Sequence, residues 1–263
     1  MKTIFHSDNW VEIPAGEFPI GISPIQEKII AERMLNQFKS NYFPYWKKRL
    51  LENVPWLTFD QQSIHLERFY IMRYQISSAQ VAAFYRGEIK HIPGSLEGSN
   101  MIKSQKGLPD IEAHNISKVS NKFAEEFCNV LGARLPSSLE WEKAARGTEG
   151  YLYPWGDDWD VNAGYFYRGQ FSTPKKAWEM QRIDAFPKGV SPYGIFGMIG
   201  YLPERTGKFP YNGAKGCHPS ETTAEYAWID CMVPFVHKRG EYSSLRPVLD
   251  KWPLQQWQGI DLQ

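Results

Sequence analysis

The sequence predicts an α+β domain with little regular secondary structure. Helical patterns are confined to the first 147 residues, and the rest of the chain consists of short strand patterns between long, aromatic loops. The 263 residues include 18 Pro and 21 Gly, which is typical of many turns and short elements. Because 42% of the residues are hydrophobic and 15% are aromatic, a substantial core is available, and we expect loop aromatics to be buried in it.

Two short strands and a helical segment are expected at the start of the chain. Residues 10–22, WVEIPAGEFPIGI, predict two strands around a Pro-Ala-Gly turn. Residues 27–54 show helical periodicity that is interrupted near Pro44. Its two apolar faces are expected to consist of Ile29, Ile30, Met34 and Phe38, and of Trp46, Leu50 and Leu51. Because its basic residues are partly balanced by Glu, we interpret the polar side as a solvated face rather than an acidic partner's binding site.

A strand, a helix and a loop are expected next. Residues 63–74, SIHLERFYIMRY, alternate as a single strand. The following SSAQVAAFYRG predicts a short helix capped by Ser77 or Ser78. Residues 88–114 are expected to form a loop, because Pro and Gly recur in them.

Two amphipathic helices are predicted before Gly147. The first, in NISKVSNKFAEEFCNVLG, places four apolar side chains toward a core: Phe123, Phe127, Val130 and Leu131. The second starts with a capping box, in which the side chains of Ser137 and Glu140 bind the backbone N–H groups of the first turn. Trp141 lies on its apolar face, and Gly147 provides the left-handed residue that ends it.

The segment after this helix, YLYPWGDD, carries more large rings than an exposed loop usually holds. We interpret these rings, Trp155 among them, as packing beneath the loops. Asp157, Asp158 and Asp160 are interpreted as part of a structural turn, the alternative being a carboxylate cluster for acid–base or metal chemistry.

Composition and charge exclude several classes of function. The net charge is +1 and no region is strongly basic, so we expect neither nucleic acid nor a membrane as partner. The start, MKTIFHSDNW, has no apolar segment, and no apolar run has the length of a membrane span. Three cysteines do not suggest a disulfide framework. We therefore expect a soluble cytoplasmic protein.

Five motifs, in order and spacing, resemble the formylglycine-generating enzyme (sulfatase-modifying factor) family. They are WVEIPAGEFPIG, HLERFYIMRYQISSAQVAAF, GARLPSSLEWEKAARG, YPWGDDWDVNAGYF and YSSLRPVLD. The resemblance implies a C-type-lectin-like fold that is poor in regular structure. It also implies a single domain over residues 1–263, with a helical insertion at about 24–59 and a short C-terminal tail at 251–263.

The resemblance implies that a copper site should be sought, because oxidases of this family hold copper with two cysteines five positions apart. If Arg239 is matched to the arginine that follows them, Cys231 takes the place of the second cysteine and Tyr226 that of the first. A phenol does not replace a thiolate for copper(I). Cys217 lies too far away in the sequence to be a direct replacement, although loops could bring it close. Cys231 is thus the one candidate catalytic residue, and the alternative is a small buried hydrophobic residue.

Iron and calcium are not expected either. The iron-dependent members need paired ligands of the His-x-x-x-His-x-Glu type, and none of the six histidines has such spacing. The resemblance implies that Tyr201 takes the place of an asparagine that helps to coordinate calcium in members of the family. The second calcium region retains Asn162 but has Lys175 and Lys176 where an acidic ligand is required. We therefore expect no metal ligands and no cofactor, with copper or iron only if the protein is an enzyme.

Two functions from different classes are compatible with these residues. The first is a binding or accessory module for a peptide, a protein or a small ligand that has lost the copper pair. The second is an oxidase or oxygenase with a rebuilt, metal- and oxygen-dependent site that acts in peptide or natural-product maturation. Besides Cys231, the residues expected to line the site are Glu204, Arg205, Tyr226, Trp228, His237 and Arg239.

Overall fold

The computed structural model describes ten parts of the chain. They are residues 7–38, 44–45, 47–48, 61–87, 89, 119–166, 182–207, 213–217, 231–235 and 243–252. The helices are α1 (Pro24–Phe38), α3 (Ser78–Tyr85), α4 (Asn121–Val130) and α5 (Ser138–Arg146), with 3-10 turns at Ser7–Asn9, Pro187–Gly189 and Val233–Phe235. The strands are β1 (Trp10–Ile13), β2 (Gly16–Ile20), β3 (Gln62–Leu66), β4 (Phe69–Met72), β5 (Glu204–Thr206), β6 (Gly213–Lys215) and β7 (Val248–Leu249).

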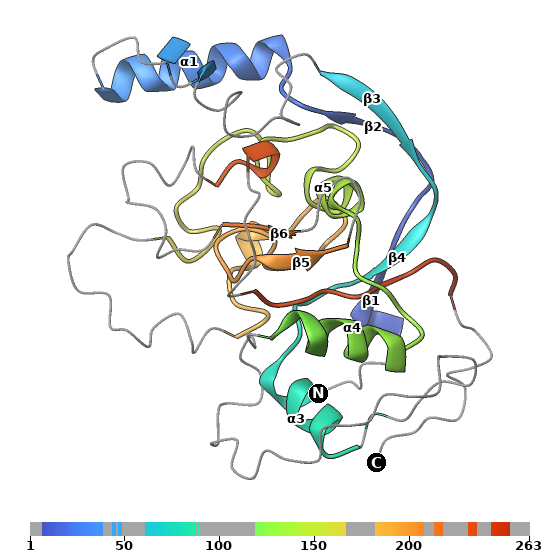
Figure 1. The fold of residues 1–263 in the computed structure, drawn as a ribbon. Coiled ribbons are helices and arrows are strands. Elements are labelled where there is room, and N and C mark those ends of the chain that lie inside the picture. Colours follow the sequence, from blue (N-terminus) through green and yellow to red (C-terminus); the bar gives the residue numbers. More distant parts are fainter. Residues whose placement is uncertain are drawn as a thin grey trace.

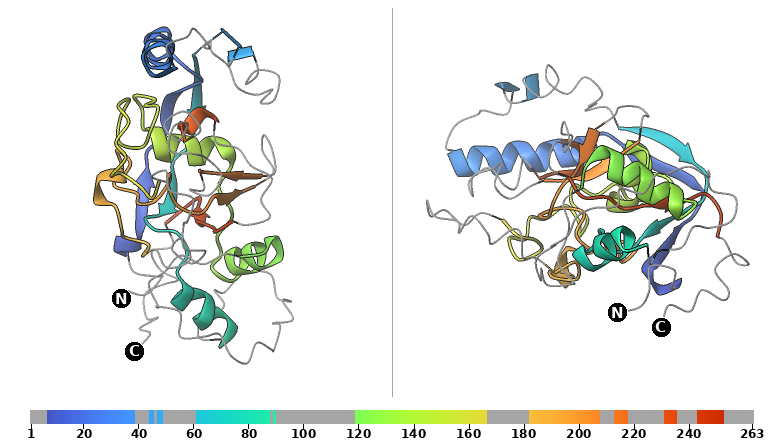
Figure 2. Two further views of the ribbon diagram at one scale, coloured as in Figure 1. Left: turned by 90° about the vertical axis from the view of Figure 1, so that its left-hand side faces the viewer. Right: turned by 60° about the horizontal axis from the view of Figure 1, so that its bottom comes forward.

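Short antiparallel strands make up three small sheets. One sheet has the order β1-β4-β7, and the other two pair β2 with β3 and β5 with β6. Helix α1 lies at one end of the molecule and α3 with α4 at the other, whereas α5 lies between them (Figures 1 and 2). None of the helices in the described residues is long and apolar enough to cross a membrane. The scarcity of regular elements agrees with the sequence-based expectation.

The single strand expected over residues 63–74 is wrong, because the structure contains two strands there. β2 pairs with β3 from Gly16 opposite Leu66, and β1 pairs with β4 as far as Ile13 opposite Phe69. The chain is therefore interrupted between β1 and β2 and, directly opposite, between β3 and β4. Lys143 of α5 holds the bend, since its ammonium group donates to the carbonyls of Pro14 and Gly16 at 2.8 and 2.9 Å.

The helix starts follow local sequence rules. Ser77 and Ser137 are N-caps with complete capping boxes, because the side chains of Gln80 and Glu140 accept hydrogen bonds from the cap N–H groups. α4 is capped by Ser120 and buries the four apolar residues predicted for its core face. Phe84 of α3 lies against the aromatic rings of this face, with a centroid distance of 5.0 Å to Phe123. The predicted loop over residues 88–114 lies outside the described residues, apart from residue 89.

α1 docks on the aromatic loop that follows α5. Its buried side chains are Gln26, Ile30 and Met34, while Ile29 and Phe38 are half-buried. The Gln26 amide donates to the carbonyl of Gly150 and to the carboxylate of Asp157, both at 2.9 Å. The helical periodicity predicted from residue 27 onward is a helix as far as Phe38. The second predicted face lies outside the described residues, and the insertion at about 24–59 stays a prediction.

The aromatic loop is partly buried, as the sequence predicts. Tyr153 is fully buried and stacks on Trp155 with a centroid distance of 5.3 Å and an interplanar angle of 6°. Trp155 and Trp159 are half-buried and contact the cores on both sides of the loop. Asp157 accepts a hydrogen bond from the backbone of Leu152 at 2.8 Å, which is the structural-turn role expected for it.

Three charged side chains are buried together between α5 and β6. The carboxylate of Glu142 accepts hydrogen bonds from Arg146 at 2.7 Å and from Lys215 at 3.2 Å. Arg146 donates further hydrogen bonds to the carbonyls of Gly21 and Gly150, both at 2.7 Å. Burial alone would raise the pKa of Glu142, but the charges of Lys215 and Arg146 outweigh it, and the pKa is lowered.

This lowered pKa predicts that the free energy of unfolding decreases at acidic pH. The contribution of Glu142 is present above the ordinary carboxyl pKa of 4.5 and is lost as the pH falls through the lower folded-state value. Glu142→Gln should therefore reduce the free energy of unfolding at pH 7 and make it less dependent on pH below 4.5. Urea unfolding at several pH values measures both effects.

The matched control for that experiment is Glu67→Gln, because the Glu67 side chain is 91% exposed. It should retain the pH dependence of the unchanged protein. If Glu142→Gln retained that dependence as well, the assigned role of Glu142 would be wrong.

Candidate functional site

Glu204, predicted to line the site, lies in the centre of the protein and is fully buried. Its two carboxylate oxygens accept hydrogen bonds from Arg246 at 2.7 and 2.8 Å. Trp141 and Gln75 donate to the same carboxylate, each at 2.9 Å. All four of these hydrogen bonds are made within the protein, and Trp141 is fully buried, as predicted from its place on the helix.

Arg205, the next predicted site residue, connects β5 to the start of α4. Its side chain is 4% exposed and donates to the carbonyl of Val119 from two nitrogens, at 2.8 and 3.2 Å. It also donates to the side chain of Asn121. Glu204 and Arg205 are consecutive in the sequence, but their side chains contact different partners. Tyr226, Trp228, His237 and Arg239 lie outside the described residues, and their roles stay predictions.

Cys231 forms a disulfide with Cys217, and the Cα atoms of the two residues are 5.2 Å apart. Both cysteines are buried, at 0% and 2% exposure, in a cluster that includes Met198 and Val233. The three cysteines did not suggest a disulfide framework, so this disulfide was not predicted from the sequence. The two cysteines lie 14 positions apart along the chain. The N–H of Val233, two residues after Cys231, donates to the carbonyl of Leu152 at 2.8 Å and holds this segment near the core.

This disulfide determines whether copper fits. Copper(I) requires thiolates, and a sulfur bonded to another sulfur is not a thiolate. The oxidised pair therefore does not fit a copper ion. The third cysteine, Cys128, is a buried free thiol whose pKa is raised by burial.

The described residues of the two calcium regions make contacts within the protein. Tyr201, for which the resemblance implies the position of a calcium-binding asparagine, is 3% exposed and packs edge-on against Phe186 at a centroid distance of 5.7 Å. Asn162 donates from its backbone and its side chain to the carboxylate of Asp160. Within the part of the chain that the structure describes, no three His, Cys, Asp or Glu residues are grouped so that they could hold a metal ion.

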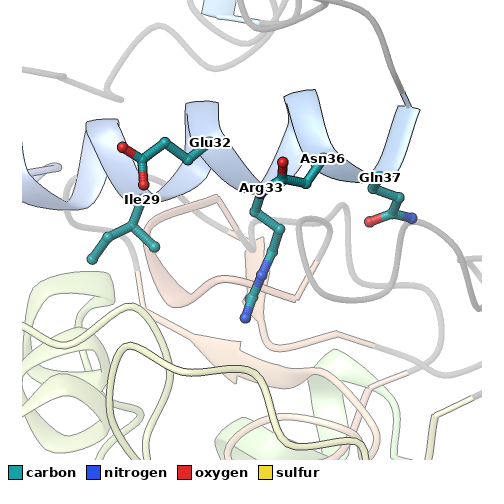
Figure 3. A pocket seen from close by; sticks show the side chains of 5 residues that line it. All are labelled: Ile29, Glu32, Arg33, Asn36 and Gln37. Atoms are coloured by element: carbon teal, nitrogen blue, oxygen red, sulfur yellow. The ribbon is translucent and has the colours of Figure 1, made fainter.

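A pocket of about 500 Å³ lies along α1. The described residues that line it are Ile29, Glu32, Arg33, Asn36 and Gln37 (Figure 3). This pocket was not predicted from the sequence, because the polar side of the segment was interpreted as a solvated face. The available signal was that Ile29, which was assigned to the apolar face, lies at helical spacing from Glu32 and Arg33, two residues of opposite charge.

Arg33 connects the pocket to the aromatic loop. Its side chain extends from α1 toward the rest of the protein in Figure 3 and hydrogen bonds with Tyr153. Burial raises the pKa of Tyr153, and the charge of Arg33 and its hydrogen bond oppose this rise without cancelling it. The phenol therefore stays protonated at neutral pH, and its stacking on Trp155 holds it in place.

The sequence and the fold are both similar to those of known proteins. The family described as the sulfatase-modifying factor enzyme 1-like domain matches residues 3–222, so the chain belongs to it. The solved structure of PvdO from Pseudomonas aeruginosa is similar with a TM-score of 0.51 at 12% identity, covering 91% of this chain and 93% of PvdO. The expected α+β fold of the formylglycine-generating enzymes is confirmed.

Two curated relatives differ in how much of this chain they match. YfmG of Bacillus subtilis strain 168, described as uncharacterized, is 27% identical over 219 residues, or 73% of this chain and 40% of YfmG. The inactive C-alpha-formylglycine-generating enzyme 2 of Bos taurus is 36% identical over 93 residues, or 34% of this chain and 31% of that protein. The matched regions thus span less than half the length of either relative.

The disulfide predicts a redox-dependent stability. Closing a loop of this length restricts the unfolded chain and is worth about 3 kcal/mol in the chain-entropy description. Reduction of the purified protein should lower the free energy of unfolding by about that amount, as measured by urea unfolding with and without a phosphine reductant. The variant Cys217→Ala/Cys231→Ala is the control, because reductant should leave its stability unchanged. An equal effect of reductant on the variant would contradict the disulfide as the cause.

Proposed function

We propose that this protein is a binding or accessory module on the scaffold of the formylglycine-generating enzymes and does not carry out their copper-dependent oxidation. One observation carries the proposal: the sulfur of Cys231, the candidate catalytic residue, is bonded to Cys217 inside a hydrophobic cluster. A copper(I) site needs two thiolates that are available to the ion. The ligand expected for such a module is a peptide, a protein or a small molecule.

Two further findings support this proposal. One relative over part of the chain is described as an inactive formylglycine-generating enzyme. In addition, the described residues of the scaffold are held by interactions that need no metal, chiefly the buried ion pair between Glu204 and Arg246. Loss of the copper pair is therefore compatible with an intact fold.

A specific observation favours the alternative, an oxidase with a rebuilt metal site. Cys217 and Cys231 are already side by side, so a two-electron reduction of their disulfide would place two thiols together. Two opposed thiolates suit copper(I). In this alternative Cys217 would take the part of the first cysteine, in place of Tyr226.

The disulfide also bears on where the protein works. Disulfides persist in oxidising compartments and are rare in the cytosol, where thiols are kept reduced. A cytoplasmic location, as expected from the sequence, would therefore expose this pair to reduction. We favour an oxidising compartment for the disulfide form.

Copper(I) titration distinguishes the two functions. The chain is titrated anaerobically against a competing copper(I) chelator, before reduction and after reduction with removal of the reductant. The proposal predicts no stoichiometric binding to the oxidised chain. After reduction it predicts binding no tighter than that of the single variant Cys231→Ser, because burial disfavours the thiolates.

The matched control in this titration is Cys128→Ala, which removes the thiol outside the pair. Tight binding of one copper(I) per reduced chain would contradict the proposal if both Cys217→Ser and Cys231→Ser abolished it and Cys128→Ala did not. That result would assign the protein to the oxidases.

A further inference from the structure

We propose that the pocket along α1 binds a small zwitterionic ligand, namely an α-amino acid or a short peptide with a free carboxylate and a free ammonium group. The inference rests on the proposed binding function and names its site and ligand class. The pocket has a volume of about 500 Å³ and is open to solvent, because Glu32, Asn36 and Gln37 are exposed.

The side chains that line the pocket are complementary to such a ligand. The described lining residues supply one guanidinium, one carboxylate, two amides and one aliphatic group, and these come from α1. Ile29, Arg33 and Gln37 follow one another at a spacing of four residues, so they form one row on the helix surface. Glu32 and Asn36 form the neighbouring row with the same spacing. A ligand that lies along the helix can therefore meet opposite charges and an apolar group together.

Arg33 is the group suited to the carboxylate of the ligand. A guanidinium has five N–H groups in a planar fork, so it can bind a carboxylate and the hydroxyl of Tyr153 together. The phenol ring is fully buried and stacked on Trp155, which limits the movement of the arginine side chain. The amide of Asn36, which follows Arg33 at a spacing of three residues, can donate a further hydrogen bond on the same side of the helix.

Glu32 is the group suited to the ammonium group of the ligand. Its side chain is 62% exposed and lies 3.8 Å from the ammonium group of Lys28, which is 78% exposed. Exposed ion pairs of this kind are weak. When Arg33 binds the carboxylate of the ligand, the ammonium group at the other end of the ligand can therefore compete with Lys28 for the carboxylate of Glu32.

The helix that carries the pocket is itself fixed in position. Ile30 and Met34 are buried on its inner face, and Gln26 hydrogen bonds to Gly150 and to Asp157. The pocket side chains thus project from a backbone that is anchored in the core. This anchoring reduces the ordering that a ligand would have to impose.

Isothermal titration calorimetry on the full chain with its disulfide intact tests the proposal with three dipeptide probes. Ala-Leu carries both charges, N-acetyl-Ala-Leu lacks the ammonium group, and Ala-Leu-amide lacks the carboxylate. Ala-Leu should bind, and each blocked probe should bind at least about tenfold more weakly, because each loses a charge-assisted hydrogen bond.

Variants assign the two ends of the ligand. Arg33→Gln should weaken Ala-Leu about tenfold and abolish the difference between Ala-Leu and its amide. Glu32→Gln should abolish the difference between Ala-Leu and the acetylated probe. Asn36→Ala should weaken both Ala-Leu and the acetylated probe, and it provides an exposed position in case Arg33→Gln fails to fold. Leu35→Ala, exposed and outside the pocket lining, is the matched control and should leave binding unchanged.

Two outcomes would overturn the inference: no saturable binding of Ala-Leu, or binding that Glu32→Gln and Asn36→Ala leave unchanged. Binding that persists in the pocket variants would refute this site and still leave a binding function. Failure of the proposed function is recognised separately, by tight copper(I) binding to the reduced cysteine pair.

Discussion

The buried ion pair between Glu204 and Arg246 is the interaction on which the arrangement of the elements depends. Both side chains are fully buried, and a buried charge without its partner is strongly destabilising. The guanidinium of Arg246 also donates to the carbonyl of Met72 at the end of β4 and to that of Phe196. The carboxylate of Glu204 also accepts a hydrogen bond from Trp141 of α5. A single charge pair thus connects segments from the start, middle and end of the chain, which explains how so few regular elements form a defined core.

Local features of this fold were predictable from the sequence, and features that depend on long-range contact were not. The capping box of Ser137 and Glu140 involves neighbours in the sequence, so its residues alone reveal it. The disulfide of Cys217 and Cys231 depends on how loops are placed over the core, and no spacing rule indicates it. The break between β3 and β4 depends on the partner strands, which bend at the same level. The pocket along α1 was missed because polar residues on a helix usually face solvent.

Separation of the scaffold from the metal site explains how the function of this chain could diverge. The charges at Glu204 and Glu142 are neutralised by protein groups, and the ring of Tyr201 is buried. The surface next to the core carries the additional helix α1, whose pocket lies beside the aromatic loop. Change at this surface leaves the central ion pair untouched.

The central claim is tested most directly by a double-mutant cycle on Glu204 and Arg246, measured as free energies of unfolding in urea. Glu204→Gln and Arg246→Met should each cost about 3–5 kcal/mol, because each leaves the other charge buried without its partner. The double variant should cost well below the sum of the two, with a coupling energy of at least about 2 kcal/mol. Costs that add to within about 0.5 kcal/mol would contradict the claim that this pair holds the fold together.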